Sequence, residues 1–222
     1  MQKFDTPAPI RAVLNIPAGR VRFLATDRAD TTVTVRPADA AKGRDVTTAQ
    51  RTTVAYADGV LRIHTPAVNR YLGRGGSVEV TVALPAGSRV EATSAACEVI
   101  GTGRLGEVTF DGAYRQITIE HAAGVHLTAV DGDVEVGRLD GPARISTTRG
   151  DIRITEAVRG TVVLDTQSGG ISVGAAAGVS ATLDAGTSFG RISNTLKNSD
   201  GAAAQLDIRA TTTHGDILAR SL

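Results

Sequence analysis

Charged side chains recur at one position of a repeated turn. In chain order, the residues at this position are Glu98, Gln116, Asp133, Asp151, Gly170, Arg191 and Asp216. Stacked carboxylates could hold Ca²⁺, which takes about six to eight oxygen ligands. However, the Gly-Gly-x-Gly-x-Asp repeat of calcium-binding β-rolls is absent, and an Asp in a Gly-Asp turn normally caps backbone N–H groups. We therefore expect Asp133, Asp151, Arg191 and Asp216 to be surface residues of a turn stack, without a metal.

A second group of carboxylates raises the alternative of an enzyme that acts on a polysaccharide. Asp131, Asp133, Asp151 and Asp165 could share a strand face, where paired acids support glycoside hydrolysis. The aromatic rings that line sugar grooves are scarce, because the chain has no Trp, three Tyr and four Phe. A long insertion that could build a groove is also missing.

The histidines and the cysteine give a weaker indication of chemistry. His64, His121, His126 and His214 are scattered, although a His base and coils of similar length occur in acyltransferases with a left-handed hexapeptide helix. Residues beside the apolar positions do not keep the hexapeptide preference, so acyl transfer stays within the enzyme alternative. Cys97 has no neighbouring His and is predicted to be a small packed residue.

One loop carries an aromatic side chain between two charges. Arg70, Tyr71 and Arg74 lie in the Gly-rich stretch 69–76 and could contact a protein partner. The stretch lacks the Lys-Ser/Thr ending of a phosphate-binding loop. We therefore predict no nucleotide and no other cofactor.

Composition excludes several classes of protein. The 24 Lys and Arg nearly balance 23 Asp and Glu, so attraction to nucleic acid is not expected. A single cysteine excludes an intrachain disulfide. Stretches of about 20 apolar residues, as a membrane span needs, do not occur, and the N-terminus lacks the apolar core of a signal peptide. These features predict a soluble, cytoplasmic protein.

A repeat must position all of these residues. A turn with Gly precedes an alternating apolar segment, as in Gly132–Val136, Gly150–Ile154 and Gly169–Val173. The first apolar residues stand at 99, 117, 134, 152, 171, 192 and 217, with successive differences of 18, 17, 18, 19, 21 and 25. A second alternating pair, such as Val162/Leu164, lies half a repeat away. Alternation predicts two strands per repeat, and a near-constant period predicts stacked copies.

The predicted fold class is an all-β, single-stranded β-solenoid with coils of ~18 residues that stack in chain order. Residues 88–222 form the regular coils, and 1–87 form irregular first coils or a cap within one continuous domain. Strands are expected at 10–16, 20–25, 31–36, 51–56, 59–65 and 77–84. Pro37–Gln50 is either a loop or a short helical turn. Residues just before the turn glycines, such as Thr148 and Ser168, should stack outside or cap the turns.

Several segments carry a resemblance to a known family. They are Phe4–Pro7, Ala29–Pro37, Tyr56–Gly59, Leu84–Ser88, Gly103–Glu107, Phe189–Asn194 and His214–Ile217, together with the Gly-Asp turns. Over essentially the whole chain, the sequence resembles β-strand-repeat proteins provisionally named adhesins, a domain of unknown function. The resemblance implies the β-solenoid and brings no catalytic residue.

These observations favour a non-enzymatic binding or assembly module, either adhesin-like or a cytoplasmic scaffold. It would present flat strand faces and an exposed terminal coil to a protein partner or to itself. Self-association is expected at the last coil, because the chain ends on a strand with no cap after it. The alternative is an enzyme that acts on a polysaccharide or an acyl donor along a solenoid face.

Overall fold

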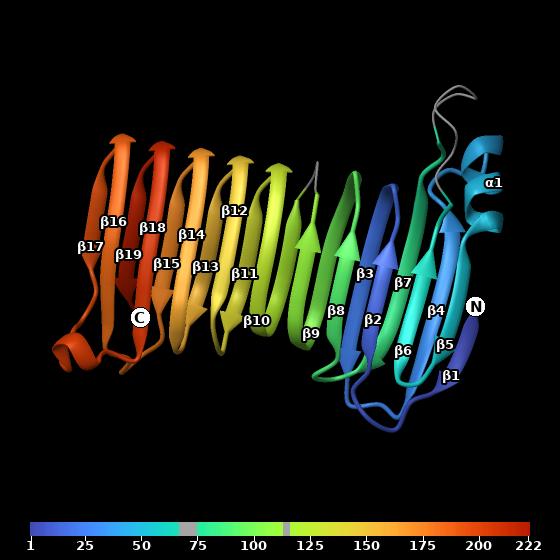
Figure 1. Ribbon diagram of the computed structural model, residues 1–222, viewed down its shortest axis with the longest axis horizontal. Helices are drawn as coiled ribbons and strands as arrows, with labels where there is room; N and C mark the ends of the chain where they lie inside the picture. The colour runs from blue at the N-terminus through green and yellow to red at the C-terminus, as the bar shows by residue number, and fades with distance from the viewer. Residues whose placement is uncertain (67–74, 113–115) are drawn as a thin grey trace. The chain divides into compact units, whose positions relative to one another are not determined.

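The computed structural model describes residues 1–66, 75–112 and 116–222 (Figure 1). The chain divides into two compact units, an N-terminal unit Met1–Arg115 and a C-terminal unit Gln116–Leu222. Each unit is built from β-strands, and α1 (Gly43–Arg51) is the α-helix of the described residues. Within these residues no helix has the length and apolar character that crossing a membrane requires.

In the C-terminal unit, successive strands of the chain lie alternately in one and the other of two facing sheets. They are β10 (Ile117–Asp131), β11 (Val134–Leu139), β12 (Ala143–Arg149), β13 (Ile152–Ala157), β14 (Gly160–Ser168), β15 (Ile171–Ala175), β16 (Ala181–Phe189), β17 (Ile192–Thr195), β18 (Leu206–His214) and β19 (Ile217–Ser221). A 3-10 turn, η2 (Gly201–Ala203), precedes β18. Every pairing between these strands is parallel, and the register is continuous except for a shift between Ile154 and Ala157 where β13 pairs with β15.

The register stacks equivalent residues of successive coils. In one sheet, Ile152 pairs with Val134 on one side and Ile171 on the other. In the other sheet, Val162 pairs with Ala143 and Ile208. These side chains are buried between the two sheets, because alternate residues of a strand point to opposite faces. The unit is thus a two-stranded coil repeated in parallel, as the alternation in the sequence predicts.

The coils do not stack in chain order, which corrects one expectation. β19 lies between β15 and β17, and β18 lies between β14 and β16. The last coil of the sequence is therefore inserted one place inside the stack, and β16–β17 is the outermost coil (Figure 1). Inserting a final strand pair between two coils satisfies its backbone groups on both sides. The chain therefore ends in a paired strand rather than at the edge.

The N-terminal unit has a similar two-sheet arrangement. Its strands are β1 (Gln2–Asp5), β2 (Arg11–Asn15), β3 (Ala18–Thr26), β4 (Asp30–Pro37), β5 (Thr53–Ala57), β6 (Val60–His64), β7 (Val78–Pro85), β8 (Arg89–Thr93) and β9 (Ala96–Asp111). β2 lies between β6 and β8, and β3 lies between β7 and β9, so the first coil is also inserted. On the outer side of β6, β5 pairs antiparallel with it. On the outer side of β7, β4 pairs antiparallel with it, and β1 pairs antiparallel with β4.

The predicted all-β fold class is confirmed by this architecture. The six strands expected in 1–87 correspond to β2 through β7. The Ala57–Gly59 turn joins antiparallel β5 and β6, with Asp58 and Gly59 both at positive φ, as such a hairpin requires. The stretch Pro37–Gln50 contains α1, so the helical alternative is correct. The division at residue 87/88 stays a prediction.

Asp30 should make the N-terminal unit sensitive to acid. Arg28 Nε donates to Asp30 Oδ1 at 2.9 Å, and Lys3 Nζ lies 3.0 Å from Oδ2, so these hydrogen bonds lower the pKa of Asp30 to about 2. An unfolded Asp has a pKa of about 3.9. The stabilisation is therefore complete above pH ~4 and declines as the pH falls toward ~2. We expect Asp30→Asn to flatten this decline in urea midpoints measured from pH 7 to 2.

The loss of stability at low pH should persist in part in the Asp30→Asn variant, because the pKa values of Asp39, Glu91 and Asp140 are also lowered in the folded protein. Asp58→Asn is the matched control, because Asp58 is an exposed turn residue that forms no ion pair with any other residue that the structure describes. An acid profile of Asp30→Asn that matches the parent protein would contradict this account.

Candidate functional site

The predicted turn stack exists in the C-terminal unit and binds backbone. Asp133 Oδ1 accepts from the Asp151 amide at 2.8 Å, and Asp151 Oδ1 accepts from the Gly170 amide at 2.7 Å. Asp216 Oδ1 accepts from the Arg191 amide at 2.8 Å. Each carboxylate thus holds the turn of the next coil. Asp216 precedes Arg191 in the stack, which corrects the chain-order arrangement.

This use of the carboxylates agrees with the expectation that they cap turns. No group of three or more His, Cys, Asp or Glu in the described part of the chain is arranged to hold a metal ion. Arg191 offers its backbone to the stack and its side chain to solvent. Arg70, Tyr71 and Arg74 fall outside the described residues.

A row of inward threonines was not predicted. Thr166, Thr212 and Thr187 each donate their hydroxyl to a turn glycine, at 3.2 Å to Gly150 O, 3.0 Å to Gly169 O and 3.1 Å to Gly215 O. Each Thr stands three residues before a glycine, a signal present in the sequence. Thr148, Ser168, Ser188 and Thr213, which were expected either to stack outside or to cap the turns, are exposed, in agreement with the first of these alternatives. Thr148, Thr213 and Ser188 each follow a residue of the inward side by one position, so the alternation turns them to the outer face.

Removing one of these hydroxyls should destabilise the C-terminal unit. Thr166→Val keeps the shape of the side chain but leaves Gly150 O without its donor. We expect the free energy of unfolding to fall by about 1 kcal/mol, measured by urea denaturation. Thr148→Val is the control, because Thr148 is exposed, and should change the value by less than about 0.5 kcal/mol. Equal effects of the two substitutions would contradict the assigned capping role.

The polar network with a histidine joins four side chains of the C-terminal unit. His121 Nε2 lies 2.6 Å from Asp140 Oδ2, and Arg138 donates to Asp140 at 3.0 Å and to Glu156 at 2.6 Å. Partial burial acts to raise the pKa of the Asp140 carboxyl, but His121 and Arg138 outweigh it and hold this pKa below its usual value. The network ties coils together, since Arg138 and Glu156 are paired across β11 and β13.

The remaining candidate groups are separated. Asp131 pairs with Arg149 at 3.1 Å, while Asp165 lies on the outer face of β14 opposite Ser146. His214 stacks on Phe189 with ring centroids 4.8 Å apart. Cys97 is buried, as expected for a packed residue, and its thiol faces Ile16 O at 3.5 Å. The four carboxylates of the polysaccharide alternative are not brought together.

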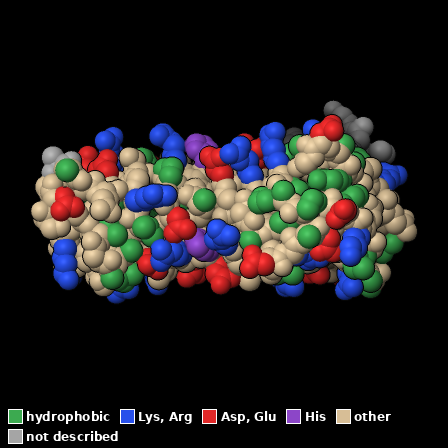
Figure 2. Space-filling model, turned by 90° about the horizontal axis from the view of Figure 1, so that it is seen from below, with side chains coloured by type: hydrophobic (Ala, Val, Ile, Leu, Met, Phe, Trp, Pro, Cys, Tyr) green, Lys and Arg blue, Asp and Glu red, His purple; other side chains and the backbone are tan. Residues whose placement is uncertain are grey.

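Charges of both signs are interspersed over the face of the molecule drawn in Figure 2. Many form pairs between strands that lie far apart in sequence, for example Arg11 with Glu91 at 2.6 Å. The separation of these two residues does not match the repeat period, because the first coil is inserted. Arg138 and Glu156, in contrast, are 18 residues apart, so the repeat alone could have identified that pair.

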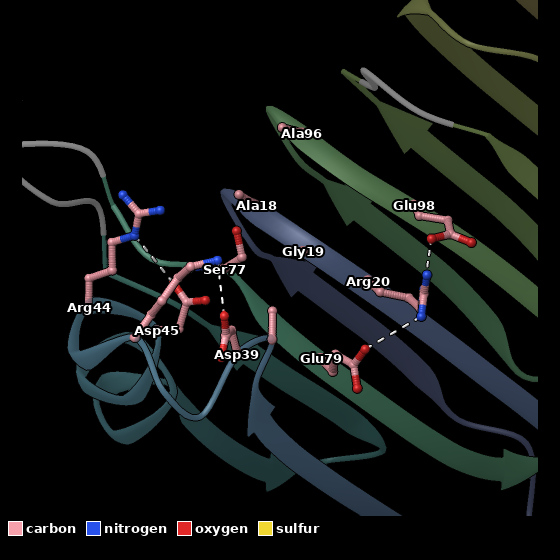
Figure 3. A pocket seen from close by; sticks show the side chains of 12 residues that line it. Ala18, Gly19, Arg20, Asp39, Arg44, Asp45, Ser77, Glu79, Ala96 and Glu98 are labelled. Carbon is pink, nitrogen blue, oxygen red and sulfur yellow. Dashed lines mark hydrogen bonds and ion pairs between the residues drawn. The ribbon is translucent and has the colours of Figure 1, made fainter.

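A polar cavity of about 470 Å³ lies in the N-terminal unit, between α1 and the ends of β3, β7 and β9 (Figure 3). Arg20 spans it, with Nε 2.7 Å from Glu98 and Nη1 3.5 Å from Glu79. The buried Asp45 carboxylate accepts from the Ser77 amide at 3.0 Å. Arg20 thus offsets part of the acidic charge of the lining, and the hydrogen bond between Asp45 and Ser77 holds α1 against the sheet.

The open coil is the feature best placed to bind another molecule. We use this name for β16 and β17, which lack a strand on their outer side among the described residues of the C-terminal unit. Phe189 is 67% exposed and Ile192 is 47% exposed, whereas Ile217, next to Ile192 in register, is 1% exposed. The open coil therefore displays Ile192, an interior side chain by register, beside strand edges that no further strand covers, whereas Phe189 lies in an exposed row with His214.

Comparison with protein families identifies this architecture. The model of the Toastrack DUF4097 family matches residues 13–220. The chain belongs to this family. Toastrack describes a domain of unknown function, so membership defines the fold class and leaves the ligand open. None of the curated proteins is significantly similar to this Toastrack chain.

Solved structures similar to this Toastrack chain include two bacterial proteins with provisional names. An adhesin, so named provisionally, from Bacteroides fragilis is 12% identical, with a TM-score of 0.58 over 98% of this chain and 95% of that chain. A provisional cell adhesion protein from Clostridium sporogenes is 12% identical over 100% and 98%, with a TM-score of 0.39. Only the first TM-score supports a shared fold.

Proposed function

We propose that this Toastrack chain is a non-enzymatic binding module that engages a protein partner through its open coil. The observation that carries the proposal is that β16 and β17 have no strand on their outer side among the described residues, with the interior side chains of Leu183 and Ile192 left partly uncovered between them. Such an edge pairs readily with another chain. The provisional adhesion names of the structural relatives are consistent with a binding role.

As secondary parts of this proposal, the flat outer faces of the strands also contact the partner, and the protein is located in the cytoplasm. One row of the outer face carries hydroxyl groups at Thr148 of β12, Thr213 of β18 and Ser188 of β16, with Gln167 of β14 between the first two. Binding through this face would need side-chain contacts, whereas binding at the open coil also uses backbone hydrogen bonds. The open coil is therefore the stronger candidate.

A photo-reactive amino acid at Ser188 tests the proposal in native lysate. Ser188 is exposed on β16 of the open coil, and Thr148 lies in the same outer row on β12, three strands further in. We expect protein adducts, including adducts of a second copy, at Ser188 and not at Thr148. Equal adducts at both positions would contradict assignment to the open coil, and none at either would contradict the binding role.

A further inference from the structure

The open coil exposes two strand edges with an apolar interior between them. Leu183 and Ala185 of β16 are half-buried, although their register partners Ile208 and Ala210 on β18 are buried. In β17, Ile192 is similarly uncovered. Sheets that pack face to face lie ~10 Å apart. A partner that covers this end fully must therefore supply two strands ~10 Å apart with apolar side chains between them. A single extended peptide would pair with only one of the two strand edges and would leave half of the interior exposed.

The outer strands of the N-terminal unit, β1 and β5, also lack a strand on their outer side among the described residues, but they match the open coil poorly in length. Phe4 of β1 and Tyr56 of β5 contact each other with ring centroids 5.6 Å apart. Thr6 and Thr31 share a buried hydrogen bond of 2.8 Å beside them. These side chains fill the space between the two edge strands. β1 has four residues and β5 has five, whereas β16 has nine, so head-to-tail stacking of the open coil onto the N-terminal unit of another copy would leave part of β16 unpaired. The matching surface within this chain is a second open coil.

We propose that two copies of the chain pair their open coils about a two-fold axis to form a closed dimer, not a filament. The axis is perpendicular to the sheet of β16. β16 then pairs antiparallel with β16 of the other copy, and β17 with its counterpart. This matches strands of nine and four residues with strands of equal length, and the pairing of β16 begins at Thr182, because the Ala181 amide already donates to Lys197 O at 3.1 Å. The inference rests on the proposed function, because it names a second copy as the partner of the open coil.

Charge complementarity selects this orientation. With pairing centred on Ala185, Asp184 faces Gly186 of the other copy, so like charges are not directly opposed. The same pairing brings Arg191 beside Ser180 of the other copy, whose hydroxyl accepts from the Asp200 amide at 3.1 Å. Arg191 and Asp200 are exposed and oppositely charged. The other two-fold, which would pair β16 with β17, brings the two Arg191 side chains together at one turn.

Charge reversal tests the dimer and its orientation together. By analytical ultracentrifugation, we expect the purified chain to be a dimer that grows no larger with concentration. Arg191→Glu and Asp200→Arg should each weaken dimerisation about tenfold or more, and the double variant should recover most of the loss. Both sites are exposed, so thermal unfolding should confirm that each variant folds. A spin label at Gly186→Cys should report a short distance between copies.

Three results would overturn the inference: a monomer at ~100 µM, well above the micromolar range of specific pairs, continued growth into filaments, or single variants that weaken dimerisation without recovery in the double variant. A monomer that still gives adducts to another protein at Ser188 would overturn the dimer and leave the proposed function standing. A monomer without any adduct would overturn both.

Discussion

Gly150→Ala should strongly destabilise the C-terminal unit. Gly150 lies in the turn of the central coil with φ +133°, a conformation that a side chain disfavours. A Cβ there would approach Gly132 O to 2.3 Å and Gly132 C to 2.6 Å, both backbone atoms of the preceding coil. Strain and overpacking together should lower the free energy of unfolding by about 2 to 5 kcal/mol, as measured by urea denaturation.

Gly170→Ala is the matched control in an equivalent turn. A Cβ at Gly170 would meet Asp216 O at 3.4 Å and Asp151 Oδ1 at 3.7 Å, and its φ lies outside the left-handed region. Because alanine restricts the unfolded chain more than glycine does, this substitution should be neutral or stabilise by up to about 1 kcal/mol. Similar losses at both glycines would show that the coils are not as closely stacked as the structure places them.

Ile171→Ala should cost nearly as much stability, for a different reason. Ile171 is 1% exposed and lies between Ile152 and Ile217 in the buried column of one sheet. Truncation removes buried apolar surface and leaves a cavity that the rigid strands on both sides cannot fill. The expected loss is about 2 to 5 kcal/mol, again from urea denaturation.

The equivalent truncation in the open coil separates stability from assembly. Ile192 belongs to the same column but is 47% exposed, so Ile192→Ala should cost the monomer less than about 1 kcal/mol. It should weaken the proposed dimer, since Ile192 would be covered there. If Ile192→Ala destabilised the monomer as much as Ile171→Ala, the open coil would not be the outermost coil.

The strands and turns of each coil could be predicted from the sequence, because each depends on residues that are close together in the chain. Alternating apolar residues identified the two strands of each coil, and the turn glycines identified where the chain reverses. The order of the coils could not be predicted, because register depends only on the side chains that face the core. Ile217 fits the column equally well beside Ile171 or beyond Ile192.

The site was predictable where one repeat contacts the next. The roles of Asp133 and Asp151 follow from their spacing, since each holds the turn one coil further on. The open coil was not predictable, because it results from the insertion of β18–β19 inside the stack. The same insertion explains why the end of the chain was wrongly expected to form the exposed coil.

Disulfide cross-linking tests the inserted coil most directly. Ser172, Leu218 and Ser193 occupy one outer row on β15, β19 and β17, in that order. Neighbouring parallel strands lie ~4.8 Å apart, within the ~4.4–6.8 Å that a disulfide spans between Cα atoms. The buried Cys97 should not compete. We predict that Ser172→Cys with Leu218→Cys forms a disulfide and that Ser172→Cys with Ser193→Cys does not; the reverse result would mean that the coils stack in chain order and would contradict the account.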